Sequence, residues 1–180
     1  MSDHVPPGTS TVTPYLCVRR CSAAIDWYVD VFGAVEDGPR YTDPDGRVGH
    51  ASIRIGGAEI MLSDAYPDYG AVAPEEGAAT ATFAVQVFVP DADATVAAAE
   101  RAGAVVQRPV AEAFHGSRLG TLMDPFGVRW MVGTHVRDPG AEELLVEACE
   151  QGADLIVGCP YTDTDPDAQI ARIFAIARRF

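Results

Sequence analysis

The chain has 180 residues, of which 48% are hydrophobic, so it can bury a sizeable core as one domain or as two small fused ones. Its formal net charge of −13 at pH 7 argues against nucleic acid and anionic membrane surfaces as partners, because both would repel it. Since the sequence has no apolar run of about 18 residues and no apolar signal segment, we expect a cytoplasmic protein with reduced cysteines.

The first part of the chain predicts a β-α-β-β-β module over residues 11–64, after a flexible N-terminus at residues 1–10. Alternating apolar residues indicate strands, and apolar residues at helical spacing indicate one helix. The predicted elements are, in order, a strand at 11–18, a helix at 23–32, a strand near 35–41 and a hairpin over 47–62. Ser22 is the expected N-cap of the helix, and Gly33 is expected to end it.

A second copy of this module is predicted over residues 80–136. Its elements are a strand at 80–89, a helix at 92–102 capped by Asp91, a strand at 105–109 and a hairpin that turns at 124–127. The spacing supports a repeat, because Gly127 lies 70 residues after Gly57. Residues 65–79, rich in Pro, Gly, Tyr and Glu, are either a plain connection or a loop that contacts a ligand.

Residues 137–180 depart from the repeat and predict a helix-strand-helix extension. Its elements are a helix at 141–150, a short strand at 154–157 and a helix at 166–179 capped by Asp165. The pattern Asp163-x-Asp165-x-Asp167 lacks the glycine and final glutamate of a calcium loop, so we interpret it as a helix cap. We expect the extension to pack on a sheet edge, a dimer interface or the mouth of a cleft.

Alternation within the strands assigns each side chain to a helix-facing side or to an open side of the sheet. In the first module, the residues expected on the open side are Tyr15, Cys17, His50, Ser52, Arg54, Glu59 and Met61. In the second module they are Gln86, Phe88, Arg118, Leu122, Arg129 and Met131, while Leu119, Thr121 and Met123 are expected to face the helices. A sheet face that mixes polar and apolar side chains is typical of a small-molecule cleft.

Two sequence motifs carry a resemblance to a known family. The Asp124-Pro125-Phe126-Gly127 turn before Arg129-Trp130, and the strand end Ile60-Met61-Leu62-Ser63-Asp64, resemble the vicinal oxygen chelate superfamily, in its glyoxalase-like and bleomycin-resistance-like branch. The resemblance covers about residues 11–136. It implies an α+β fold in which two βαβββ modules form a curved mixed sheet, here with a C-terminal helical extension, and a homodimer whose sheets enclose small-molecule clefts.

Metal-dependent members of that superfamily place His, Gln or Glu on the first and last strands of each module. The matching positions here are Thr13, Met61, Ala84 and Met131. None of these side chains suits a divalent metal that prefers imidazole or carboxylate ligands. A slip of two residues would bring in Tyr15 or Gln86, with Glu59 nearby, but it leaves no set of His and Glu ligands. We therefore expect no metal and no other cofactor.

The resemblance and the open faces together suggest a metal-independent protein that sequesters a hydrophobic or cationic drug or metabolite. The acidic charge either favours a cationic ligand or serves only solubility. The expected ligand-binding residues are Tyr15, Cys17, Ser52, Arg54, Met61, Gln86, Phe88, Leu122, Arg129 and Met131.

The first alternative is a metal-free lyase or isomerase that acts in the same cleft. In this alternative His50, Glu59 and Arg118 supply the acid-base and anion-stabilising groups. Arg118 then either binds an anionic group or pairs with Glu59 across the cleft. A metalloenzyme with unorthodox ligands is the second alternative.

Overall fold

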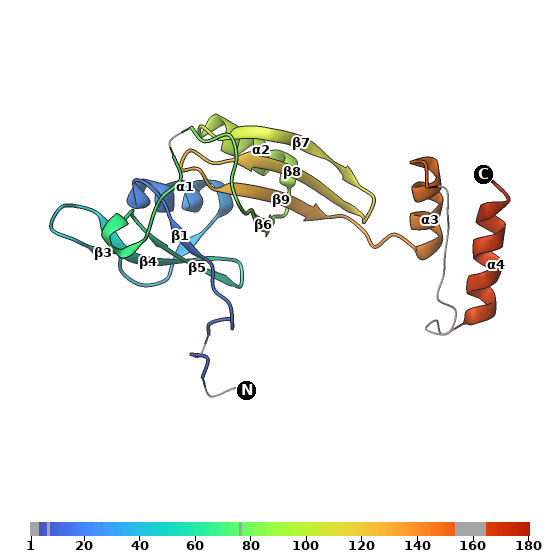
Figure 1. Ribbon diagram of the computed structural model, residues 1–180, viewed down its shortest axis with the longest axis horizontal. Helices are drawn as coiled ribbons and strands as arrows, with labels where there is room; N and C mark the ends of the chain where they lie inside the picture. The colour runs from blue at the N-terminus through green and yellow to red at the C-terminus, as the bar shows by residue number, and fades with distance from the viewer. Residues whose placement is uncertain (1–3, 7, 76, 154–164) are drawn as a thin grey trace. The chain divides into compact units, whose positions relative to one another are not determined.

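The computed structural model describes residues 4–6, 8–75, 77–153 and 165–180 (Figure 1). Contacts divide the chain into two compact units: unit 1 comprises residues 1–111 and 118–134, and unit 2 comprises residues 112–117 and 135–180. The expected strand at 154–157 and Asp163 lie outside the described residues.

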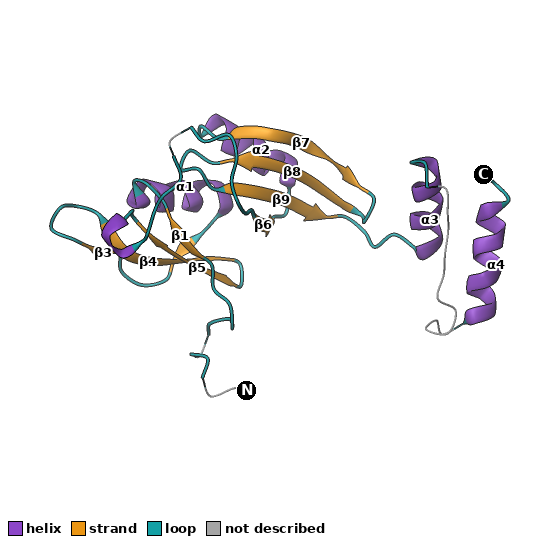
Figure 2. Ribbon diagram, in the orientation of Figure 1, coloured by secondary structure: helices purple, strands orange, loops and turns teal. Residues whose placement is uncertain are grey.

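Unit 1 begins with the first module and its mixed sheet (Figure 2). The elements are β1 (Tyr15–Cys17), α1 (Cys21–Phe32), β2 (Val35–Glu36), β3 (Tyr41–Thr42), β4 (Val48–Ile55) and β5 (Ala58–Ser63), followed by the 3-10 helix η1 (Pro67–Tyr69). The strand order is β1-β5-β4-β2, and β3 also pairs with β4. β1 runs parallel to β5, whereas β4 is antiparallel to β2, β3 and β5. The strand expected near 35–41 is thus two short strands along β4.

The second module has the same order of elements and the same order of strands. Its elements are β6 (Val85–Phe88), α2 (Ala92–Arg101), β7 (Val105–Ala113), β8 (Ser117–Met123) and β9 (Arg129–His135). The sheet order is β6-β9-β8-β7, with β6 parallel to β9. In both modules the first strand therefore lies beside the last, which confirms two βαβββ units in an α+β fold. The strand expected at 80–89 is shorter, because it starts only at Val85.

One hydrophobic core joins the two modules, and aromatic side chains of α1 form much of it. The rings of Phe32 and Trp130 lie 4.6 Å apart between centroids, and those of Tyr28 and Trp130 lie 5.3 Å apart. The Trp27 indole Nε1 donates a hydrogen bond to the carbonyl oxygen of Ala102, at 2.9 Å. Buried aromatic rings remove a large apolar area from water, so these contacts hold the second module onto the helix of the first.

The cap of α1 comes from the other end of its module, so the prediction of Ser22 as N-cap is wrong. The helix begins at Cys21, and the preceding residue, Arg20, has a left-handed backbone (φ 56°) and caps no backbone group with its side chain. The backbone N–H of Cys21 instead donates to Oδ1 of Asp64 at 3.0 Å, and that of Val48 donates to Oδ2 at 2.8 Å. A carboxylate just after β5 thus fixes the start of the helix against the sheet.

The second module repeats this arrangement with different chemistry. The backbone N–H of Ala92, at the start of α2, donates to the hydroxyl oxygen of Thr134 at 2.8 Å, and that hydroxyl donates to the carbonyl oxygen of Val89. Asp91 also caps α2 as predicted, because its carboxylate accepts a hydrogen bond from the N–H of Ala94. Thr134 lies 70 residues after Asp64, so the position of the capping side chain follows the repeat.

The predicted faces are confirmed in the first hairpin. Ile55 pairs with Ala58 across the Gly56-Gly57 turn. The buried residues of the two strands that face the helix are Ala51, Ile53, Ile60 and Leu62.

The faces are wrong in β8 of the second hairpin. The N–H of Asp124 donates to the carbonyl oxygen of Val128 at 2.9 Å, so the loop holds only Pro125, Phe126 and Gly127. The odd loop length shifts the register of β8 by one residue. Leu122 is consequently fully buried in the core.

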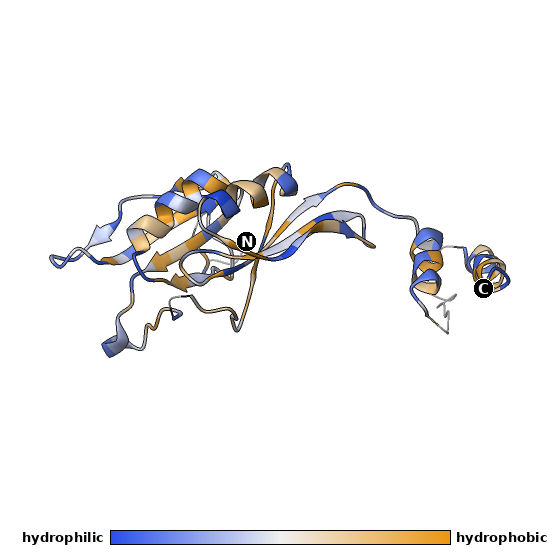
Figure 3. Cartoon of the chain, turned by 90° about the horizontal axis from the view of Figure 1, so that it is seen from above, coloured by the Kyte–Doolittle hydropathy of each residue, from blue (hydrophilic) through white to orange (hydrophobic). Residues whose placement is uncertain are grey.

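Unit 2 joins the tip of the β7–β8 hairpin to the C-terminal residues. The carbonyl oxygen of Gly116 accepts hydrogen bonds from the N–H groups of Val136 and Arg137, each at 3.0 Å. The helices α3 (Ala141–Glu150) and α4 (Pro166–Ala177) contact each other, and each mixes hydrophobic with hydrophilic residues (Figure 3). Asp165 caps α4 as predicted. No helix in the described ranges is long and apolar enough to cross a membrane.

Candidate functional site

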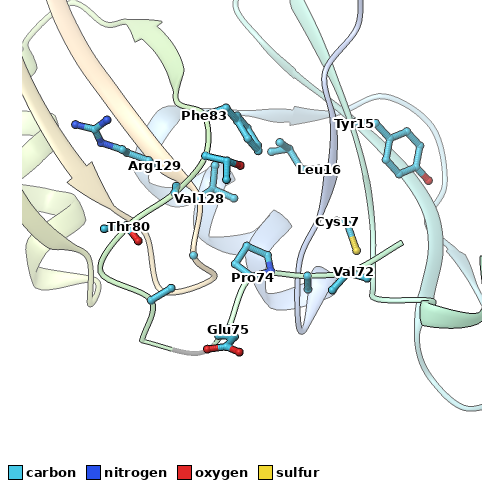
Figure 4. Close-up of a pocket in the computed structure, with 15 residues that line it drawn as sticks. Tyr15, Leu16, Cys17, Val72, Pro74, Glu75, Thr80, Phe83, Val128 and Arg129 are labelled. Atoms are coloured by element: carbon cyan, nitrogen blue, oxygen red, sulfur yellow. The ribbon is translucent and has the colours of Figure 1, made fainter. Parts of the chain in front are cut away.

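A cavity of about 470 Å³ lies between β1, residues 72–75 and 78–83, and the start of β9 (Figure 4). We call it the loop cavity. Its polar lining residues are Tyr15, Cys17, Glu75, Thr80, Thr82 and Arg129, and the rest of its wall is apolar or glycine. In Figure 4, Leu16 points toward Phe83, and Cys17 points toward Val72. The connecting segment thus forms one wall of a cavity.

Several contacts hold this wall against the second sheet. The side-chain amide of Gln107, on β7, donates from Nε2 to the carbonyl oxygen of Ala79 at 2.8 Å. The same amide accepts a hydrogen bond at Oε1 from the guanidinium of Arg129 at 3.0 Å. Gly127 has φ +87°, and a Cβ atom there would lie 2.6 Å from Cβ of Pro74. Only glycine allows the turn and the loop to approach this closely.

Cys17 contributes a protonated thiol to the loop cavity. Its Sγ donates to the carbonyl oxygen of Asp64 at 3.6 Å. Burial, followed by the negative charge of Asp64, raises the pKa of the Cys17 thiol. A thiol with a raised pKa is a poor nucleophile near neutral pH. The geometry therefore favours Cys17 as a packing residue of the wall.

The open side of the first sheet holds the residues that the alternation predicted there. Tyr15, Met61 and Ser52 are register partners on three neighbouring strands, so they form one row across the sheet. The Tyr15 hydroxyl and Nδ1 of His50 are 3.4 Å apart, and the ring centroid of Tyr41 lies 6.2 Å from that of the imidazole. This side of the sheet is thus an aromatic surface around one histidine.

The open side of the second sheet combines amide, thioether and aromatic side chains. Gln86 and Met131 are register partners on β6 and β9, and Phe88 is 59% exposed. Arg129 shares this side and reaches the loop cavity. Leu122 does not share it, as the register of β8 shows.

The three expected acid-base residues do not surround one space. Arg118 faces α2, where its guanidinium donates two hydrogen bonds to the carboxylate of Asp93, at 2.8 and 2.9 Å. The predicted pairing of Arg118 with Glu59 is therefore wrong. Glu59 lines a different cavity, and His50 contacts Tyr15. A lyase or isomerase that uses all three side chains on one substrate finds no support in this arrangement.

Asp124 is a buried carboxylate that several groups contact. The sequence pattern placed it in a turn but did not indicate that it is buried. Its carboxylate accepts hydrogen bonds from the Tyr28 hydroxyl at 2.8 Å and from the Trp130 indole at 2.9 Å. It also accepts from the backbone N–H groups of Phe126 and Val128. Burial raises the pKa of Asp124, and the hydrogen bonds oppose that rise. The group holds the β8–β9 turn in place behind the loop cavity.

The superfamily's metal positions do not fit a metal in this chain. Met61 and Met131 lie on the open sides of the sheets, where they offer thioether sulfur, and the other two positions hold Thr13 and Ala84. A divalent metal of the zinc type prefers imidazole, thiolate or carboxylate. Within the part of the chain that the structure describes, no three His, Cys, Asp or Glu side chains gather as metal ligands.

Comparisons with known proteins agree with this fold. An uncharacterized protein of Mycobacterium bovis is 35% identical over 154 residues, which cover 84% of this chain and 99% of that protein. The crystal structure of TioX from Micromonospora sp. ML1 is 22% identical, covers 73% of this chain and 100% of its own, and has a TM-score of 0.52. A Pseudomonas aeruginosa protein is 27% identical, covers 72% and 100%, and has a TM-score of 0.53.

A family model matches residues 8–132, a range that spans both βαβββ modules. This match agrees with the repeated strand order and with the turn and strand-end motifs of the sequence. The chain therefore belongs to the Glyoxalase/Bleomycin resistance protein/Dioxygenase superfamily.

Proposed function

We propose that the protein binds a small organic molecule in the loop cavity without a metal ion, and that it works as a homodimer in the cytoplasm. The cavity volume of about 470 Å³ carries the proposal. This volume is typical of ligand pockets, which are lined mainly by apolar side chains with a few polar groups that orient the ligand. The loop cavity has this composition.

The ligand that fits best is a hydrophobic or cationic drug or metabolite, which the protein would sequester. Leu16, Phe83 and Val128 supply apolar contact area, and the carboxylate of Glu75 can pair with a positive group. The net charge of −13 would attract cations toward the protein from a distance. The guanidinium of Arg129, which also lines the cavity, donates a hydrogen bond to the side-chain oxygen of Gln107.

A substitution that fills the loop cavity tests this function. Ala78 lines the cavity, so Ala78→Trp places an indole in the space that the ligand needs. We expect binding of berberine, a planar aromatic cation whose fluorescence rises in apolar surroundings, to weaken by about tenfold or more in this variant. The measurement is a fluorescence titration of the full chain.

Ala79→Trp is the matched control, because it adds the same side chain at the neighbouring exposed residue, which does not line the cavity. We expect it to bind berberine as the wild type does. Equal affinities of the wild type and Ala78→Trp would rule out the loop cavity as the binding site.

A further inference from the structure

A second cavity, of about 270 Å³, lies beside the β4–β5 turn, β6 and the residues before β1. We call it the hairpin cavity. Most of its wall is apolar, with contributions from Val12, Ile60, Val85 and Trp130. Besides Glu59, the polar side chains that line it are those of Ser10 and Gln86. No residue lines both this cavity and the loop cavity.

Glu59 is the unusual feature of the hairpin cavity. The residue is only 8% exposed, and its Oε2 atom is buried without a hydrogen-bond partner among the described residues. Burying a carboxylate oxygen without a partner is costly, because the atom loses its hydration and gains no hydrogen bond. Buried polar atoms in native proteins normally have a hydrogen-bond partner, and a ligand in the cavity could provide one for Oε2 of Glu59.

The arginine closest in register does not supply that partner. Arg54 lies directly opposite Glu59 on the neighbouring strand. Its guanidinium, however, donates to the carboxylate of Asp37 at 2.7 Å and to the carbonyl oxygen of Gly8 at 2.9 Å. These contacts direct the Arg54 guanidinium to Asp37 and Gly8, so Arg54 donates no hydrogen bond to the buried Oε2 of Glu59.

We propose that the hairpin cavity is a second binding site, for a small organic cation whose ammonium group donates to Glu59 and whose apolar body contacts Val85 and Phe88. One carboxylate among apolar walls suits an ammonium group, because a hard metal ion requires six or more oxygen ligands. Gln86 and Ser10 can accept further N–H groups. Because the two cavities share no lining residue, this inference does not rest on the function proposed for the loop cavity.

The test is calorimetric titration of benzylammonium chloride into the full-length wild type and its variants at neutral pH. Glu59→Gln keeps the shape of the side chain and removes its charge, so we expect about a tenfold loss of affinity. Glu100→Gln is the matched control, because it removes the same charge from an exposed residue of α2 that lines neither cavity. We expect Glu100→Gln to stay within about twofold of the wild type. Glu75→Gln is titrated as well, because a loss in that variant alone would place the cation in the loop cavity.

Benzyl alcohol, a neutral molecule of similar shape, separates the charge effect from a loss of fold. We expect the wild type and Glu59→Gln to bind it equally well. Ala58→Trp gives a second variant, because Ala58 lines the cavity at the exposed turn and a bulky side chain there should abolish binding of both probes.

Four results would overturn the inference. The first three are the absence of benzylammonium binding by the wild type at millimolar concentration, equal affinities of the wild type and Glu59→Gln, and unchanged binding by Ala58→Trp. A loss confined to Glu75→Gln would also overturn it, because the cation would then occupy the loop cavity. That last result would leave the proposed function intact.

Discussion

Asp124 shows how one side chain can hold several elements together. Its two carboxylate oxygens receive four donors, from the Tyr28 hydroxyl, the Trp130 indole and the backbone of Phe126 and Val128. Tyr28 belongs to α1 of the first module, whereas the other donors surround the turn of the second. The group therefore couples the two modules through a single buried acceptor.

Replacing the Asp124 carboxylate should lower the free energy of unfolding. In Asp124→Asn an amide NH₂ takes the place of one oxygen, so buried donors lose their acceptor. We expect a loss of about 2–4 kcal/mol in the free energy of unfolding, measured by urea titration. Tyr28→Phe removes one donor only and should cost about 1 kcal/mol. A loss in Asp124→Asn no larger than that of Tyr28→Phe would show that the other donors find new partners.

The caps of α1 and α2 are expected to contribute different amounts to the stability of the fold. Asp64→Ala leaves the N–H groups of Cys21 and Val48 without their acceptor, so we expect it to lower the free energy of unfolding by about 2–4 kcal/mol. Thr134→Val removes only the hydroxyl, and Asp91 still caps α2, so about 1 kcal/mol is expected. Urea unfolding of both variants checks the order, and a larger loss in Thr134→Val would contradict it.

The sequence predicted the order of the elements well, because alternation and helical spacing are local properties of the chain. It also predicted the faces of the first hairpin, where two glycines set an unambiguous two-residue turn. It failed on β8, because the side chain of Asp124 takes the N–H groups of Phe126 and Val128 and shortens the loop. That shift moved Arg118 and Leu122 to the helix side, and only the folded turn reveals it.

The candidate site was predictable only where it lies on strands. Tyr15, Met61 and Gln86 occupy the sides that the alternation assigned to them. The wall of the loop cavity is different, because the segment 72–83 has no periodicity from which a direction could be inferred. Its position depends on distant contacts, such as the hydrogen bond between Gln107 and Ala79.

The acidity of the chain bears on the proposed homodimer. Two copies that each carry a formal charge of −13 repel one another, and dissolved salt screens that repulsion. We therefore expect the dimer to tighten as the ionic strength rises from about 20 mM to about 200 mM. Sedimentation velocity at several protein concentrations gives the dissociation constant.

A chain that ends at Arg137 is the control for this measurement, since it tests whether the extension contributes to the interface. A weaker dimer in the shortened chain would support the expectation that the extension packs there. A dimer that loosens with salt would instead point to ion pairs between the copies, and a monomer under all conditions would show that the proposed assembly is wrong.

The placement of the two tryptophans has a practical consequence for spectroscopy. Trp27 and Trp130 are the only tryptophans of the chain, and both lie in the core of unit 1. Indole fluorescence therefore reports on the modules and is silent about α3 and α4, whereas far-ultraviolet circular dichroism also detects those helices. Comparing the two melting curves separates the thermal transition of unit 1 from that of the C-terminal helices without altering a single residue.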